Sequence, residues 1–141
     1  MDGTERTVEL TRAEKGVYDA VNVRGGRLRL STGDDEHFSP VELLLVAIAG
    51  CSAADVDFIT AKRAEPDSFT VAARADKVRG EAGNHLTGIR VTFDVVFPDD
   101  EGGQAAREVL PEAARRSHDR LCTVSRTVEI GTPVEVVVPE G

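Results

Sequence analysis

Two cysteines are the residues of this chain best suited to covalent chemistry. Cys51 ends an apolar run with helical spacing, "SPVELLLVAIAGC" (39–51), and Cys122 lies in "HDRLCTVSRT" (118–127). Neither belongs to a zinc-binding pattern, since no C-x-x-C motif or closely spaced pair of histidines accompanies them. A helical cysteine either fills the core as a small hydrophobic side chain or reacts as a thiolate. The residue pattern leaves both interpretations of Cys51 open.

A reactive thiolate at Cys51 would need a positive charge, because the middle of a helix contributes little electrostatic help. Asp55, one turn further on, would raise the pKa of the thiol if it faced the sulfur. The N-terminal strands offer three arginines as counter-charges, Arg24, Arg27 and Arg29. Each of them, taken alone, is most simply a solvent-exposed residue.

His118 precedes Cys122 by four residues, which places both on one helical face if the helix persists that far. The imidazole could tune the Cys122 thiol or, together with both cysteines, hold a metal ion. No fourth ligand is evident in the sequence, so we expect no metal site.

The composition is typical of a globular domain and excludes several classes of function. The length of 141 residues suits a single domain, 1–141, with 30% charged and 40% hydrophobic residues. The formal net charge of -8 and the scattered basic residues argue against nucleic acid and an anionic membrane surface as partners. The longest apolar run is too short to span a membrane and no secretory signal is visible, so we expect a cytoplasmic protein.

A long helix with clear punctuation follows an N-terminal group of strands. Glycine turns separate the three predicted strands, which cover 6–12, 16–23 and 25–31. Ser39 is a suitable N-cap, Pro40 suits the first helical position, and Glu42 completes a capping box with Ser39. The helix is predicted over 40–64, and its two adjoining apolar faces indicate that protein surrounds its first half.

The rest of the chain predicts two long strands, a second helix and a final strand. The predicted elements are strands over 68–78 and 87–97 with a turn at 79–86, a helix over 104–120 interrupted at Pro111, and a strand within 122–138. The order βββ-α-ββ-α-β indicates an α+β fold, in which the long helix carrying Cys51 packs on a mixed sheet.

Three stretches resemble motifs of the OsmC/Ohr family, the osmotically inducible protein C and organic hydroperoxide resistance proteins. In "SPVELLLVAIAGCSAADV" a proline, an acid–Leu pair and small residues lead to Cys51, eleven positions after Pro40, as in the family's cysteine helix. "SHDRLCTVSRTV" is similar to the second cysteine motif, and "VRGGR" resembles the arginine hairpin of the first strands. The predicted order of elements is also that of this OsmC-like fold.

The resemblance implies a thiol peroxidase that forms an intertwined homodimer with its sites at the subunit interface. By this analogy Cys51 attacks an organic hydroperoxide and becomes a sulfenic acid, which Cys122 converts to a disulfide. A small dithiol or thiol reductant would then reopen the disulfide, so the resemblance implies an external reductant and no bound cofactor. Arg24 corresponds to the arginine that stabilises the thiolate and orients the peroxide.

One position departs from the pattern of the hydroperoxide reductases. Their acid that holds the arginine commonly follows the proline directly, where this chain has Val41, and Glu42 lies one residue later, about 100° further round the helix. Glu42 is therefore either an acid of the catalytic site or only the capping-box residue. Two other functions stay open. One is a non-enzymatic protein that binds a hydrophobic or thiol-containing ligand beside Cys51, and the other is a redox sensor that switches through a Cys51–Cys122 disulfide.

Overall fold

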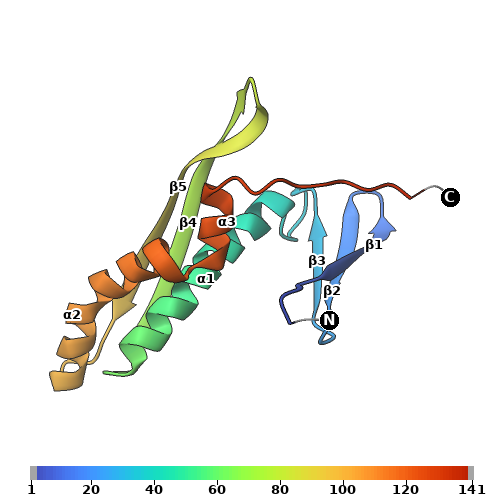
Figure 1. The fold of residues 1–141 in the computed structure, drawn as a ribbon. Helices are drawn as coiled ribbons and strands as arrows, with labels where there is room; N and C mark the ends of the chain where they lie inside the picture. The colour runs from blue at the N-terminus through green and yellow to red at the C-terminus, as the bar shows by residue number, and fades with distance from the viewer. Residues whose placement is uncertain (1–2, 140–141) are drawn as a thin grey trace. The chain divides into compact units, whose positions relative to one another are not determined.

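The computed structural model describes residues 3–139 of the chain (Figure 1). They form two compact units, one ending at Leu45 and the other beginning at Val46. Strands and helices both contribute to the fold, so the predicted α+β class is confirmed. The strands do not form the single mixed sheet that the sequence predicted. Within the described residues they form two antiparallel sheets, because short connections join strands that are consecutive in the sequence.

The first unit contains an antiparallel sheet in the order β1-β2-β3. Its strands are β1 (Val8–Glu14), β2 (Val17–Asn22) and β3 (Arg27–Ser31), as predicted within a few residues. Asn22 orders the loop between β2 and β3, since its side-chain oxygen accepts hydrogen bonds from the backbone N–H groups of Arg24 (3.0 Å) and Gly26 (2.9 Å). Gly25 completes this loop with a φ of 89°, a conformation that favours glycine.

Helix α1 (Pro40–Ala61) begins with the capping box that the sequence predicted. The backbone N–H of Ser39 donates to Glu42 Oε1 (2.9 Å), and the N–H of Glu42 donates to Ser39 Oγ (3.2 Å). The helix ends three residues earlier than predicted. Its buried residues recur every four positions and therefore mark one face; they are Ile48, Ser52, Val56 and Thr60.

Much of the remaining apolar surface of α1 is exposed in the single chain. Leu44 is 39% exposed, Val46 50% and Phe58 75%, so the expectation that protein surrounds the first half of the helix is not met within one chain. By length and composition α1 could also cross a membrane, a test that the core helix of a soluble protein passes as well. Asp55, in the same helix, accepts a hydrogen bond from the buried Ser117 hydroxyl (2.7 Å), which fits a helix packed against protein.

The second unit contains a long hairpin of β4 (Ser68–Gly80) and β5 (Gly83–Val96). The predicted turn over 79–86 is wrong, because the strands continue to Gly80 and Gly83 and leave only two residues between them. The polar end of the hairpin is exposed on both faces, so no alternation of apolar residues marks it as strand. Nearer its base, Phe69 and Phe93 pack edge to face with ring centroids 6.3 Å apart.

Three helical segments complete the second unit. They are α2 (Glu101–Arg116), a π-helical turn η1 (Ser117–Leu121) and α3 (Thr123–Glu129). Pro111 lies inside α2 without ending it. The predicted strand within 122–138 is wrong over α3, where Cys122 acts as the N-cap and its sulfur accepts a hydrogen bond from the N–H of Ser125. Residues 132–139 belong to no helix or strand and pair with no strand in the described part of the chain.

Candidate active site

Both cysteines are free thiols, and they meet at the beginning of α3. Cys51 projects from α1 and is half-buried, and the backbone N–H groups of Val124 and Thr123 act to lower the pKa of its thiol. Cys122 directly precedes these two residues, and its side chain lies near enough to Cys51 for each thiol to shift the pKa of the other. The structure therefore brings together two thiols that are far apart in the sequence.

Two serine hydroxyls contact the sulfur of Cys122, a buried residue that is only 2% exposed. The Cys122 thiol donates to Ser125 Oγ (3.2 Å), and the Ser125 backbone N–H donates to Cys122 Sγ (3.3 Å). From α1, the buried Ser52 hydroxyl donates to the same sulfur (3.8 Å). Cys122 is therefore more than a filler of the core, because polar groups surround its sulfur on two sides.

The two thiols differ in acidity. Burial raises the pKa of Cys51; the N–H of Val124 opposes this effect, and the neighbouring Cys122 adds to it. Burial also acts to raise the pKa of Cys122, but the hydroxyl and N–H of Ser125, with smaller contributions from Cys51 and Ser52, outweigh it and lower the pKa. Within one chain, the buried thiol is thus the more acidic and the half-buried thiol the less acidic.

An apolar cavity of about 290 Å³ adjoins the two serines. Its walls come from α1, β5, α2, η1 and α3, and the residues that dominate it are Ile48, Ile89, Val91, Phe93 and Val128. Ser52 and Ser125 line it as well, so the side chains that contact Cys122 also face the cavity. An apolar molecule of a few carbon atoms would fit in this cavity, next to the two serines that contact Cys122.

His118 lies at the edge of this cavity and connects η1 to α3. Its Nδ1 lies 3.0 Å from Asp119 Oδ1, and its Nε2 lies 3.1 Å from Glu129 Oε2. Hydrogen bonds to Asp119 and Glu129 raise the pKa of the imidazole. His118 thus has two carboxylate partners and a structural role. Within residues 3–139, no group of three or more His, Cys, Asp or Glu side chains is arranged to hold a metal ion.

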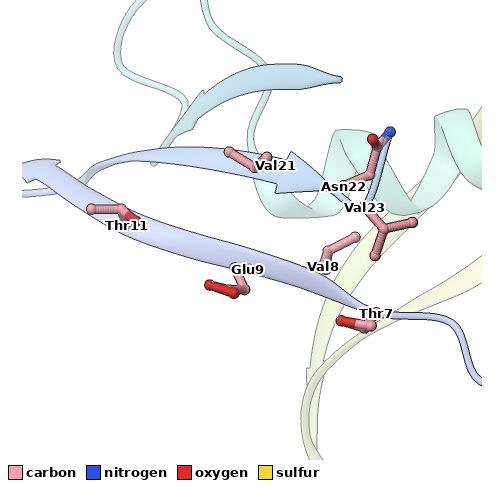
Figure 2. Close-up of a pocket in the computed structure, with 7 residues that line it drawn as sticks. All are labelled: Thr7, Val8, Glu9, Thr11, Val21, Asn22 and Val23. Carbon is pink, nitrogen blue, oxygen red and sulfur yellow. The ribbon is translucent and has the colours of Figure 1, made fainter. Parts of the chain in front are cut away.

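Arg24 and Glu42 belong to the first compact unit, whereas both cysteines belong to the second, so their roles beside the thiols stay predictions. Arg24 follows β2 and borders an open groove of about 530 Å³. A neighbouring cavity of about 230 Å³ shares Val8 and Val23 with this groove, and Figure 2 shows the two valines at the same end of the β1–β2 pair. Glu42 has the capping role described above.

Sequence reasoning missed Ser52 and Ser125 as parts of the site. Each stands in a suggestive place, Ser52 directly after Cys51 and Ser125 three residues after Cys122. A helix N-cap accepts a hydrogen bond from the backbone N–H of the residue three positions later, which is the spacing of Cys122 and Ser125. Cysteine, however, is not among the preferred N-cap residues. The approach of Ser52 to Cys122 is a tertiary contact that no local pattern reveals.

The fold and the pair of neighbouring thiols define an α+β protein with a dithiol site. The family model described as OsmC-like protein matches residues 33–137, and the chain belongs to this family. The resemblance carried by the cysteine motifs is thus confirmed. No curated protein has a significant sequence match to the chain.

Solved structures share the fold at low sequence identity. An OsmC-like protein of unknown function from Vibrio cholerae is 17% identical with a TM-score of 0.73, over 89% of this chain and 94% of that one. An organic hydroperoxide resistance protein of Bacillus subtilis is 16% identical with a TM-score of 0.55, over 88% and 90%. One from Legionella pneumophila is 12% identical with a TM-score of 0.59, over 91% of each chain. At these identities the likeness shows the fold alone.

Proposed function

We propose that the chain is a thiol-dependent peroxidase that reduces organic hydroperoxides through Cys51 and Cys122. The observation that carries this proposal is the meeting of two free thiols at the start of α3, beside an apolar cavity. The hydroperoxide resistance proteins of Bacillus subtilis and Legionella pneumophila, which share the fold, support the choice of substrate. The cavity would take the alkyl part of such a substrate.

The proposed reaction has three steps, which are oxidation of Cys51, formation of the disulfide and its reduction. The Cys51 thiolate attacks the outer oxygen of the hydroperoxide, the O–O bond breaks, and an alcohol leaves after taking up a proton. The Cys122 thiolate then attacks the sulfur of the Cys51 sulfenic acid, forms a disulfide and, with one proton, releases water. A small dithiol reductant finally supplies two electrons and two protons, restores both thiols and becomes a cyclic disulfide.

We assign the first step to Cys51 because it is the more exposed thiol, although Cys122 is the more acidic one within one chain. A peroxide must reach the sulfur that it oxidises, and Cys122 is only 2% exposed, whereas Cys51 is half-buried. Cys51 still needs a counter-charge, because burial raises its pKa. We assign that charge to Arg24, following the family resemblance.

We further propose that two chains form an intertwined homodimer. Residues 132–139 have the sequence of a strand but no partner in the described part of the chain, and Val134 and Val136 are 87% and 82% exposed. Such a segment is suited to pair with a sheet edge of a second copy, which would also cover the exposed apolar face of α1. Sedimentation equilibrium should give a mass of about twice the 15.1 kDa of one chain; a monomer would contradict the dimer.

Rapid mixing of the reduced protein with one equivalent of cumene hydroperoxide tests the proposed function. We expect both thiols of the chain to disappear together within seconds, because one sulfenic acid consumes the second thiol. Unchanged thiols would favour the non-enzymatic binding protein. Disulfide formation that stops after one cycle in excess dithiothreitol would favour the redox sensor.

Replacing Arg24 with alanine should raise the pKa of Cys51 by about one unit or more, since a nearby cation stabilises the thiolate. Peroxide consumption at pH 7 should fall about tenfold, because a higher pKa leaves less thiolate. The measurement is the pH dependence of Cys51 alkylation in a Cys122→Ser background. Arg27→Ala is the matched control, an exposed arginine of β3 whose loss should leave the pKa unchanged. The same pKa in both variants would remove Arg24 from the site.

A further inference from the structure

We propose that Ser52 and Ser125 are positioning residues that make Cys122 the leaving sulfur when the Cys51–Cys122 disulfide is reduced, so that the external thiol attacks Cys51. This inference rests on the proposed function, because it concerns the recycling step of the same dithiol site.

The contacts around Cys122 suit a thiolate better than a thiol. In the thiol form the S–H donates to Ser125 Oγ, which lies 3.2 Å away. A hydroxyl group can rotate and reverse its role, so on loss of the proton Ser125 Oγ can donate to the sulfur instead. The sulfur would then accept from three donors, the two hydroxyls and the backbone N–H of Ser125. Hydrogen bonds to a charged form favour that form, which agrees with the lowered pKa of Cys122.

The leaving sulfur of a disulfide departs faster when its thiol has a lower pKa. In the Cys51–Cys122 disulfide, the serine hydroxyls stabilise negative charge on Cys122 as the bond breaks. Within the described part of the chain no hydroxyl group hydrogen-bonds to Cys51, and burial raises its pKa. Cleavage of the S–S bond with Cys122 as the leaving thiolate is therefore favoured.

Access favours the same direction of attack. Cys122 is 2% exposed, whereas Cys51 is half-buried and open to an incoming thiolate. The thiolate of the reductant attacks Cys51 Sγ and forms a mixed disulfide with it, while the electron pair of the broken S–S bond goes to Cys122 Sγ. With a dithiol reductant, its second thiolate attacks the mixed disulfide, closes a ring and releases Cys51 as a thiolate.

The first test maps the mixed disulfide in the unaltered protein. The disulfide is formed with diamide, which requires no peroxidase activity, and the excess diamide is removed. The monothiol glutathione is then added, and N-ethylmaleimide follows after a short interval to block the thiol that the attack has released. Trypsin separates the cysteines into peptides 30–62 and 121–126. We expect glutathione on the Cys51 peptide and maleimide on the Cys122 peptide in at least tenfold excess over the reverse. Equal amounts, or glutathione mainly on the Cys122 peptide, would overturn the inference and leave the proposed function standing.

A failure of the proposed function has a different result in the same experiment. If diamide forms no Cys51–Cys122 disulfide, the two thiols do not act as a pair, and both proposals fall together. If the disulfide forms and is attacked at Cys122, only the order of recycling is wrong.

The serine variants test the cause. In a Cys51→Ser background, Ser125→Ala and Ser52→Ala should each raise the pH midpoint of the thiolate absorbance at 240 nm by about half a unit to one unit. Ser125→Thr, which keeps the hydroxyl, should restore the original midpoint. In the chain with both cysteines, Ser125→Ala should slow reduction by glutathione about threefold.

Thr127→Ala is the matched control for these variants. It removes a hydroxyl of the same helix that bonds to the Thr123 carbonyl rather than to a sulfur. Its thiolate midpoint and reduction rate should equal those of the parent protein. Serine variants that behave like Thr127→Ala would overturn the role of the hydroxyls.

Discussion

Replacing Cys51 with serine should abolish peroxidase turnover, whereas replacing Cys122 with serine should leave one turnover followed by over-oxidation of Cys51. A serine hydroxyl is not oxidised by peroxide, so the first variant loses the reacting atom and activity falls about a thousandfold or more. The second variant keeps the half-buried sulfur and forms the sulfenic acid, but no neighbouring thiol can close the disulfide. Further peroxide then converts the sulfenic acid to sulfinic acid.

Trapping with dimedone and mass spectrometry distinguishes the two variants. The dimedone adduct should appear on Cys51 in the Cys122→Ser protein, and no adduct should form on Cys122 in the Cys51→Ser protein. Because Cys122 is the more acidic thiol within one chain, the reverse pattern is the physically meaningful alternative. An adduct on Cys122, or equal residual activity in both variants, would contradict the assigned order.

Gly103→Ala should be the most destabilising single change at a glycine. A Cβ atom on Gly103 would overlap the Pro98 carbonyl oxygen, and the residue is buried. The backbone at the start of α2 must move to accept it, which also disturbs the N-cap bond from the Gly103 N–H to Asp100 Oδ1 (2.7 Å). Together, overpacking and a weakened cap should cost about 3 kcal/mol of the free energy of unfolding.

Thermal unfolding monitored by circular dichroism measures this cost. A loss of about 3 kcal/mol should lower the Tm of a domain of this size by about 10 °C. Gln104→Ala, at the next and exposed position of α2, should change the free energy of unfolding by less than about 0.5 kcal/mol. Equal stability of the two variants would show that the close approach of Gly103 to Pro98 is not as described.

The elements that the sequence predicted correctly are those with strong local signals. The capping box of Ser39 and Glu42 marks the start of α1, and glycine turns separate the first three strands. The beginning of the hairpin was also predictable from alternating apolar residues. Its far end was not, because a two-stranded ribbon exposed on both faces has no buried side to impose a pattern.

The final strand was misplaced because two properties of one segment compete. The β-branched residues of 123–128 favour a strand, yet Cys122 caps a short helix there. Cysteine is not a residue from which a helix N-cap is normally predicted. Residues 132–139 keep the composition of a strand but find no partner within the described chain. Pairing depends on what lies across from a segment, which its own sequence does not contain.

The two thiols of the site were foreseeable, and the groups that tune them were not. The spacing of Pro40 and Cys51, with the motif around Cys122, indicated the family and the pair of cysteines. The lower pKa of Cys122 depends on two serine hydroxyls, one of them contributed by α1, and therefore on tertiary packing.

One peroxide molecule is expected to join Cys51 to Cys122 in a disulfide. The direct measurement treats the reduced protein with one equivalent of cumene hydroperoxide, blocks the remaining thiols and digests with trypsin without a reducing agent. We expect peptides 30–62 and 121–126 to appear as one disulfide-linked pair, together with one equivalent of cumyl alcohol. Recovery of both peptides with blocked thiols, and of unchanged hydroperoxide, would contradict it.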